Sequence, residues 1–391
     1  MSYVLWLTSW YPSRVQPTNG DFVERHAQCV SRLHPLVVLH IEKDERLSPG
    51  TSECVETTEG NCTVFRVYYG RSRWGALSEK LFSLYTYKNL QHAYFQKIVQ
   101  KWGEPELIHV HESMKAGLLA MELKKTKRIP YVLTMHWTGY QTKFPPHYAE
   151  KGWYWNRLNK KILRQADTIT VVSNDLGNSL QEYTGPLPIQ TVHNVVDTTQ
   201  FYPAKEPPSK FRFIHASYLN QQKNPVGIIQ AAAALQRLGH SFELMLIGRE
   251  DPALMELAIR KGMSPENILI PGSLAHHQMP EALRMSSALV MFSRFENMPC
   301  IILEALCTGL PVISTRVGGI AEVVNDSNGV LVDNEDESAL MEAMKQVLEH
   351  YEEYDRKAIA QKAASFFNPD AVAQAMDTVY REVAKPLGNV K

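Results

Sequence analysis

The sequence predicts an α/β protein built from two doubly wound domains, each with a parallel sheet covered by helices. The chain has 391 residues, which is more than one hydrophobic core usually supports. Residues 3–41 read as a buried strand, a loop, a helix and a second strand, and a new alternation of strands and helices begins at residue 211. Between them, residues 201–210 hold three prolines and few apolar side chains, which is typical of a linker. We therefore expect domains at 1–200 and 201–370, followed by a C-terminal helix at 371–391.

In the first domain, runs of apolar residues alternate with segments of helical periodicity. Strands are expected at residues 3–8, 36–41, 107–111, 130–136 and 166–173, with a loop and a hairpin at 42–63. Helices are expected from 21 to 33, within 71–102 and from 174 onward. Asp21 is the expected N-cap of the first helix, because a carboxylate there can accept a free N–H.

The second domain repeats this alternation. Strands are expected at residues 211–216, 243–247, 268–270 and 288–292. Helices are expected at 225–238, 252–261, 279–285 and 301–307, and from 331 to the end, including a long amphipathic helix at 370–384.

The composition argues against several classes of protein. The formal net charge is zero, which argues against general binding of nucleic acid, and no apolar run approaches the length of a membrane span. The start of the sequence lacks the basic region of a secretory signal, and the five cysteines show no paired spacing. We therefore expect a cytoplasmic protein. A mild basic excess in the first 200 residues leaves open a peripheral contact with the inner face of a membrane.

The most informative stretch runs from residue 293 to residue 324. It holds Glu296 and Glu304, eight positions apart, then Gly-Leu-Pro-Val and Gly-Gly-Ile-Ala-Glu. The helical spacing puts Glu296 in the loop before a helix and Glu304 about one turn into it. Carboxylates at these places can accept hydrogen bonds from sugar diols, while the free N–H groups of a helix start suit a diphosphate. The simpler alternative is a solvated loop acid and a first-turn glutamate favoured by the helix dipole.

The order of these residues resembles the signature of glycosyltransferase family 4: a Glu, seven residues, a Glu-Ala, a Gly-x-Pro-Val and a Gly-Gly-x-x-Glu. Nearly the full chain is similar to this family, whose members have the GT-B fold. That fold has two Rossmann-like domains facing an interdomain cleft, with the C-terminal helix crossing back to the N-terminal domain. The resemblance implies that domain 1–200 binds the acceptor and domain 201–370 binds the nucleotide sugar.

Carried over residue by residue, the resemblance implies a donor site in the second domain. Glu304 would hold the ribose hydroxyls. Glu296 would face the hydroxyls of the donor sugar as a catalytic residue, with the backbone amides of Asn297, Met298 and Pro299 nearby. Asn297 stands where the family usually has a glycine.

A cation in the same domain would neutralise the departing diphosphate, which is the largest catalytic contribution expected here. Lys223, in Gln-Lys-Asn, resembles the family's phosphate-binding lysine and is assigned this role. Tyr218 stands where the family has an arginine, so it would donate a hydrogen bond without a charge. Gly248, directly after a predicted strand, completes the expected donor-binding set. Either Lys223 suffices, or a second cation such as Arg249 or Arg294 assists.

In the first domain, two positions match the family. Gly20, in the first loop, would let backbone amides approach the donor phosphate, although its role as a turn residue is equally compatible with the sequence. His136 ends a phrase similar to the family's Pro-x-Val-x-Thr-x-His, whose histidine contacts the donor sugar, and it is our candidate catalytic histidine. His109 and His111 share a face of a strand and are either half of a zinc site or strand-end residues near the ligand crevice.

Two segments of the first domain, 71–102 and 143–164, combine aromatic and basic residues. The first is either a surface helix that docks on a membrane or a lipid-linked acceptor, or an ordinary amphipathic helix. The second is either an acceptor loop or a packed helix with solvated basic residues.

Taken together, the sequence predicts a retaining, metal-independent glycosyltransferase without a cofactor. It would move a sugar from a UDP- or GDP-sugar to a glycan or lipid-linked saccharide in polysaccharide or cell-envelope biosynthesis. The expected partners are the nucleotide sugar and the acceptor, and nucleic acid is not among them. Two alternatives remain open: a nucleotide-sugar 2-epimerase on the same architecture, and a protein of this fold that binds a nucleotide sugar with little or no turnover. An NAD-dependent oxidoreductase is disfavoured because no Gly-x-Gly-x-x-Gly follows a strand.

Overall fold

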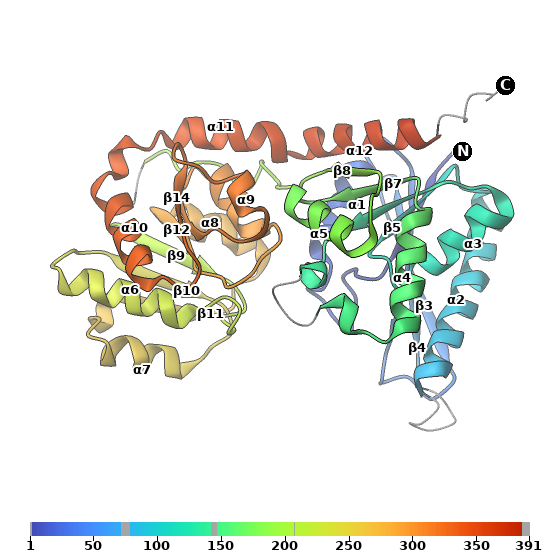
Figure 1. The fold of residues 1–391 in the computed structure, drawn as a ribbon, viewed down its shortest axis with the longest axis horizontal. Helices are drawn as coiled ribbons and strands as arrows, with labels where there is room; N and C mark the ends of the chain where they lie inside the picture. The colour runs from blue at the N-terminus through green and yellow to red at the C-terminus, as the bar shows by residue number, and fades with distance from the viewer. Residues whose placement is uncertain (1, 72–78, 142–146, 207, 385–391) are drawn as a thin grey trace. The chain divides into compact units, whose positions relative to one another are not determined.

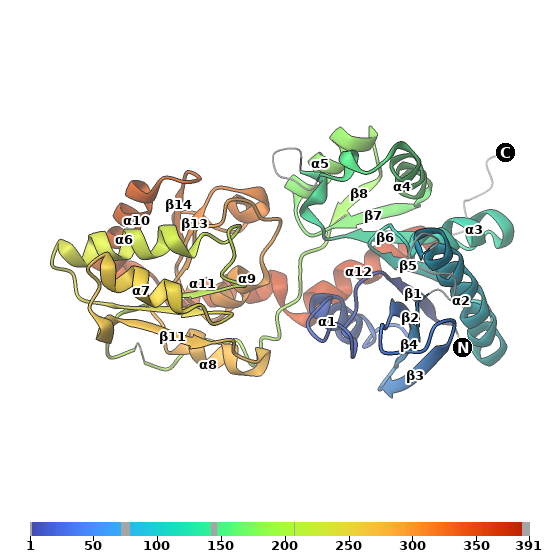
Figure 2. The same ribbon diagram turned by 90° about the horizontal axis from the view of Figure 1, so that it is seen from below.

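The computed structural model, described for all residues except 1, 72–78, 142–146, 207 and 385–391, divides into two compact units (Figures 1 and 2). The first unit comprises Met1–Val172, Leu176–Val195 and Pro369–Lys391, and the second comprises Ser173–Asp175 and Val196–Asn368. Each unit holds one mainly parallel sheet with helices packed on it. The predicted α/β class with two Rossmann-like domains is therefore confirmed.

The first unit contains an eight-stranded sheet in the order β3-β4-β2-β1-β5-β6-β7-β8. All of its neighbours run parallel except β3 and β4, which form an antiparallel hairpin. The strands are β1 (Val4–Thr8), β2 (Leu36–Lys43), β3 (Ser52–Glu59), β4 (Cys62–Tyr69), β5 (Leu107–His111), β6 (Tyr131–Met135), β7 (Thr168–Val171) and β8 (Ile189–Thr191). The central strands are buried on both faces, which explains their continuous apolar runs.

Six helices belong wholly or mainly to this unit: α1 (Asp21–Val30), α2 (Glu79–Trp102), α3 (Gly117–Lys127), α4 (Trp153–Gln165), α5 (Asn174–Thr184) and α12 (Pro369–Ala384). The last of these packs against α1, and its residues Val372, Met376 and Val379 share a core with β1 and β2. The last helix, α12, is therefore part of the hydrophobic core formed by the first strands and the first helix of the chain.

Three local predictions for this unit need correction. The N-cap of α1 is Gly20, in a left-handed conformation, and Asp21 is the first helical residue. That helix ends at Val30, three residues before the predicted end. The hairpin of β3 and β4 spans residues 52–69 and so extends beyond residue 63, the predicted end. The strand β4 also pairs with β2 along its whole length, which joins the hairpin to the sheet. Parts of the two predicted basic segments, residues 72–78 and 143–146, lie outside the described residues.

The second unit contains a parallel six-stranded sheet in the order β11-β10-β9-β12-β13-β14. Its strands are β9 (Arg212–Ala216), β10 (Glu243–Ile247), β11 (Ile268–Gly272), β12 (Ala288–Met291), β13 (Val312–Thr315) and β14 (Gly329–Val332). Its helices are α6 (Pro225–Arg237), α7 (Pro252–Arg260), α8 (Met279–Arg284), α9 (Cys300–Cys307), α10 (Glu337–Glu349) and α11 (Arg356–Phe367). Asn224, Asp251, Asp336 and Asp355 cap four of these helices with side-chain oxygens that accept backbone N–H groups.

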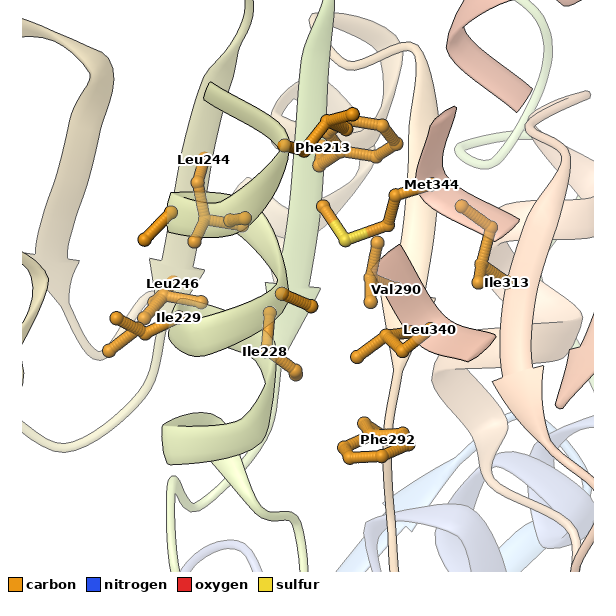
Figure 3. Close-up of a cluster of buried hydrophobic side chains, with 14 of the residues drawn as sticks. Phe213, Ile228, Ile229, Leu244, Leu246, Val290, Phe292, Ile313, Leu340 and Met344 are labelled. Carbon is orange, nitrogen blue, oxygen red and sulfur yellow. The ribbon is translucent and has the colours of Figure 1, made fainter. Parts of the chain in front are cut away.

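The core of the second unit forms where α6 and α10 cover one face of the sheet (Figure 3). Ile228 and Ile229 of α6 and Leu340 and Met344 of α10 are fully buried against strand side chains. The strands contribute Phe213, Leu244, Leu246, Val290 and Ile313. This packing fixes the sheet whose carboxyl-terminal loops carry the predicted donor residues.

Within the described part of the chain, we find no helix with the length and apolar character that a membrane span requires.

Candidate active site

The second unit brings Lys223 and Glu296 into direct contact. Lys223 ends the loop between β9 and α6, and Glu296 lies in the loop between β12 and α9. The ammonium of Lys223 donates to Oε1 of Glu296, and the Glu296 residue is only 5% exposed. The two side chains that the sequence assigned to the donor sugar and the diphosphate are therefore neighbours at the carboxyl-terminal edge of the sheet, where ligands of open α/β sheets bind.

Glu304 lies one turn into α9, as its spacing from Glu296 predicts, and is 3% exposed. Its Oε1 is 3.0 Å from Nε2 of His276, which follows β11. The ring of His276 packs against Phe201, with the centroids 5.6 Å apart, and 44% of the His276 side chain is exposed. A partly exposed imidazole thus contacts one of the two oxygens of this carboxylate.

The loop from Glu296 to Pro299 is held by the paired glycines of the motif. Gly318 has a φ of 55°, and a Cβ there would lie 2.1 Å from the carbonyl oxygen of Glu296. The next residue, Gly319, donates its N–H to the carbonyl of Asn297 at 2.9 Å. The motif glycines therefore let one backbone approach another so closely that no side chain fits between them.

The remaining residues of this loop are also packed. Asn297 accepts a hydrogen bond of 2.7 Å from Ser173 Oγ, and Met298 is buried. Pro299 is the N-cap of α9, and its carbonyl accepts the N–H of Ile302 at 3.1 Å. The positive end of the helix dipole makes the start of a helix a favourable place for a phosphate.

Other predicted donor residues lie on the β9 and β10 loops. Tyr218 is 71% exposed, so its hydroxyl is available to a ligand. Gly248 follows β10 and donates its N–H to the carbonyl of Gly272 at 3.2 Å. Of the two candidate auxiliary cations, Arg294 pairs with Glu335 at 2.8 Å, and Arg249 is exposed. Lys223, which already contacts Glu296, is therefore the cation best placed in this group.

The first unit holds the other two predicted residues. Gly20 has a φ of 80°, and a Cβ there would lie 2.6 Å from the carbonyl carbon of Trp10, so this turn requires glycine. His136 directly follows β6, with its ring 4.7 Å from Phe22 and stacked at 5.8 Å on His111. Gly20 and His136 thus lie at the carboxyl-terminal edge of this sheet, after β1 and β6.

The loop that carries His136 is anchored by Glu112, a residue that the sequence did not single out. Glu112 Oε1 accepts the backbone N–H groups of His136 and Trp137 at 2.5 and 3.0 Å. Its own backbone is left-handed, with a φ of 63°, and burial raises the pKa of this carboxyl to about 7. No local pattern marks Glu112, because its partners lie 24 and 25 residues away.

His136 belongs to a cluster of four buried histidines whose rings are neighbours. Burial lowers the pKa of His26 to about 4 and holds the pKa values of His109, His111 and His136 well below their ordinary value. All four imidazoles are therefore neutral at pH 7, and a neutral imidazole can both donate and accept a hydrogen bond.

The zinc alternative for His109 and His111 gains no support. His109 Nδ1 is 2.6 Å from the hydroxyl of Tyr380, and its Nε2 is 2.5 Å from Thr134 Oγ1. The described residues include no group of three or more His, Cys, Asp or Glu side chains arranged to hold a metal ion. Both nitrogens of His109 thus have partners within the fold, Nδ1 in α12 and Nε2 in the neighbouring strand β6.

Two family models match the chain. Residues 197–365 match the family described as Glycosyl transferases group 1, and residues 50–200 match Glycosyltransferase Family 4. The matches overlap at residues 197–200 and together cover residues 50–365.

Relatives and solved structures agree with these models. The chain is 26% identical to a putative teichuronic acid biosynthesis glycosyltransferase of Bacillus subtilis, over 87% of this chain and 88% of the relative. It is 25% identical to N-acetyl-alpha-D-glucosaminyl L-malate synthase of Bacillus anthracis, over 73% and 77%. Among solved structures, sucrose-phosphate synthase of Thermosynechococcus elongatus has a TM-score of 0.77 at 18% identity, covering 97% of this chain and 98% of that one. HepE of Anabaena, solved with UDP, has a TM-score of 0.72 at 16% identity, covering 98% and 100%. The chain is a member of the group 1 glycosyltransferases and has the GT-B fold.

Proposed function

We propose that this enzyme transfers a glycosyl group from a UDP- or GDP-sugar to a glycan or lipid-linked saccharide, with retention of the anomeric configuration and without a bound metal. The observation that carries the proposal is the pair of buried carboxylates, Glu296 and Glu304, each with a nitrogen partner beside the start of α9. This arrangement offers acceptors for two sets of hydroxyls and donors for a diphosphate within one loop system.

The proposed donor pose follows from these contacts. The ribose hydroxyls bind Glu304, which requires His276 to give up its hydrogen bond or to share the carboxylate. The diphosphate binds at the start of α9, where the helix dipole favours an anion, and at the ammonium of Lys223, which also donates to Glu296. Glu296 then accepts hydrogen bonds from the donor sugar. UDP-glucose is a reasonable first donor to test, because HepE has been solved with UDP and with UDP-glucose.

In the proposed reaction, the bond between the anomeric carbon and the phosphate oxygen breaks, and the acceptor oxygen bonds to the same carbon from the same face. The acceptor proton passes to the departing phosphate, so the second product is a nucleoside diphosphate. The chain's contribution is electrostatic: Lys223 stabilises the charge that develops on the leaving group. His136, as a neutral imidazole, would hydrogen-bond to the reacting sugar.

The proposed biological setting is the synthesis of polysaccharide or cell envelope. It is supported by the name of the Bacillus subtilis relative, a putative teichuronic acid biosynthesis glycosyltransferase. Family membership favours glycosyl transfer over 2-epimerisation, because the matched models and the named relatives are transferases.

The proposal is tested first by a thermal-shift panel of UDP, GDP, ADP and their common sugar conjugates. A ligand that binds only the folded state should add about 2.7 kcal/mol at about 100 times its Kd, which is easily seen. We expect one nucleotide series to raise the Tm of the wild type, and Glu304→Ala to lose that response. Glu342→Ala removes an exposed glutamate of α10 and serves as the matched control, with its response intact.

The outcomes separate the alternatives. If no nucleotide raises the Tm of the wild type, the donor site is wrong. If nucleotide sugars bind but neither transfer nor donor hydrolysis occurs without added metal, a binding protein or a metal-dependent enzyme replaces the proposal, and assays with added Mg²⁺ and Mn²⁺ distinguish these two.

A further inference from the structure

The helix α4 presents an exposed face that is both basic and aromatic. Its sequence, Trp153–Gln165, contains four cations and no carboxylate. Ile162 and Leu163 are buried, so the helix is firmly attached to the first unit by its opposite face. Trp153 and Tyr154 in the first turn are nevertheless 78% and 53% exposed. Large aromatic side chains left in water at one end of a helix mark an interaction surface.

Two hollows adjoin this face. The first, of about 310 Å³, is lined by residues of α2, α3 and α4, and α3 contacts both of the other helices. Its lining is largely apolar and includes Leu84, Leu118, Met121 and Leu158. Lys88, Lys125 and Lys161, one from each of these helices, also line it. The second hollow, of about 690 Å³, is lined by α4 itself and shares Lys161 with the first.

Several cations of this face form no ion pair with a described carboxylate. Elsewhere in the unit, cations do find carboxylates, as Lys124 does with Asp167 at 2.8 Å. Among the described residues, no carboxylate lies within ion-pair distance of Arg157, Lys125 or Lys161. The one acid that lines the first hollow, Glu122, is 3.4 Å from His92. The positive charge of the face is therefore available to an anionic partner.

We propose that this face, formed by α2, α3 and α4, docks on an anionic phospholipid bilayer. Phosphate groups would bind the lysines, and the indole of Trp153 and the phenol of Tyr154 would enter the interfacial region that such amphipathic rings prefer. The apolar lining between the lysines favours a bilayer over a soluble polyanion. A polyanion would satisfy the charges but leave the partly exposed Met121 and the two exposed rings in water.

This inference deepens the proposed function, because a lipid-linked acceptor is presented at a bilayer surface, but its test requires no transfer reaction. The full-length protein is sedimented with vesicles of equimolar phosphatidylcholine and phosphatidylglycerol, and with vesicles of phosphatidylcholine alone. Each Lys or Arg near an anionic surface contributes about fivefold to binding, equivalent to about 1 kcal/mol. We therefore expect tight binding to the mixed vesicles only, weakened by added salt.

Two pairs of variants locate the surface. Arg157→Ser with Lys161→Ser should weaken binding by about 25-fold. The matched control is Lys357→Ser with Lys362→Ser, two exposed cations of α11, which should change binding little. Trp153→Ser should also weaken binding, whereas Phe366→Ser, which removes an exposed aromatic residue of α11, should not.

Three results would overturn the proposal: equal binding to both vesicle types, unchanged binding in the α4 variants, or binding to soluble dextran sulfate that competes fully with the vesicles. The last result would assign the face to an anionic glycan. The response of each variant to nucleotides in the thermal-shift panel shows whether it is folded. If the vesicles bind but no nucleotide does, the proposed donor site fails and the docking surface stands.

Discussion

At the scale of single residues, Glu112 is the side chain whose role extends furthest beyond its position. One carboxylate oxygen accepts two backbone N–H groups and so fixes the start of the loop that carries His136. Glu112→Ala would leave both N–H groups without this acceptor, at about 1–3 kcal/mol for each buried group. Glu112→Gln keeps an oxygen in the same place.

We therefore expect Glu112→Ala to lower kcat and stability together, and Glu112→Gln to restore most of both. The pH profile separates positioning from packing. Because burial raises the pKa of Glu112 to about 7, the wild type should change activity near that pH, and the Gln variant should lack this transition. Glu122→Gln, at an exposed part of α3, is the matched control. A Gln variant as impaired as the Ala variant would contradict the positioning role.

The sequence revealed those site residues whose spacing is local. Glu296 and Glu304 are eight positions apart on one loop and the helix that follows it, so their placement relative to each other can be predicted from local spacing. Glu112 and His276 acquire their partners only through the fold, at sequence separations of 24 and 28 residues. A lone glutamate after a strand and one of two adjacent histidines in a loop carry no signal that distinguishes them from ordinary surface residues.

At the scale of elements, the donor loop depends on the short 3-10 helix Gly318–Glu322, because Gly318 lies against the carbonyl of Glu296. Gly318→Ala should both strain the left-handed backbone and displace that loop. Gly239 also has a positive φ, of 92°, but a Cβ there meets nothing within 4 Å. Gly239→Ala is therefore a control for the backbone strain alone, at about 1 kcal/mol.

We expect Gly318→Ala to abolish the nucleotide-induced rise in Tm, and Gly239→Ala to keep it despite a slightly lower Tm. Equal nucleotide responses in the two variants would mean that the glycine pair does not support the donor loop.

Most elements followed from apolar periodicity, because strands buried on both faces and capped helices leave strong local patterns. The helix α3 was missed, since its lysine-rich second half hides the buried face formed by Leu118, Leu119 and Leu123. The strand β14 was missed for a different reason: it has only four residues at the edge of the sheet, and its two central residues are only partly buried.

At the scale of the whole molecule, stability should depend on pH unequally in the two units. His26, His109, His111 and His136 all belong to the first unit, and burial lowers the pKa of each. In an unfolded chain their pKa values return to about 6.5. Below that pH the unfolded state binds protons that the folded state does not, so stability falls as the pH drops.

Each such histidine can contribute up to about 1.4 kcal/mol per pH unit below pH 6.5. Glu112 acts in the opposite direction, because its folded pKa is raised and the folded state binds the extra proton up to about pH 7. Burial also raises the pKa of Glu24, so four histidines stand against two glutamates, and we expect the first unit to lose stability between about pH 6.5 and about pH 4.5.

Tryptophan fluorescence during urea unfolding measures this directly, since all seven tryptophans lie within residues 1–172. His111→Phe should reduce the slope by about one proton, because neither ring nitrogen of His111 has a hydrogen-bond partner among the described residues. A slope near zero over this pH range would show that the histidines do not remain neutral in the folded state.

The hydrogen bond between Tyr380 and His109 also bears on how such enzymes are recombined. The indole of Trp6 donates to the hydroxyl of Tyr380, and the same hydroxyl lies 2.6 Å from Nδ1 of His109. The other ring nitrogen of His109 lies 2.5 Å from Thr134 Oγ1, so the hydrogen bonding of a histidine early in the chain depends on a residue 271 positions later. A chimaera that exchanges the first domain between relatives must therefore exchange two separate segments, the one that ends near Val195 and the one that begins at Pro369. A single crossover would combine the sheet of one relative with the last helix of another, so the hydrogen-bonding groups of helix and sheet would no longer be matched.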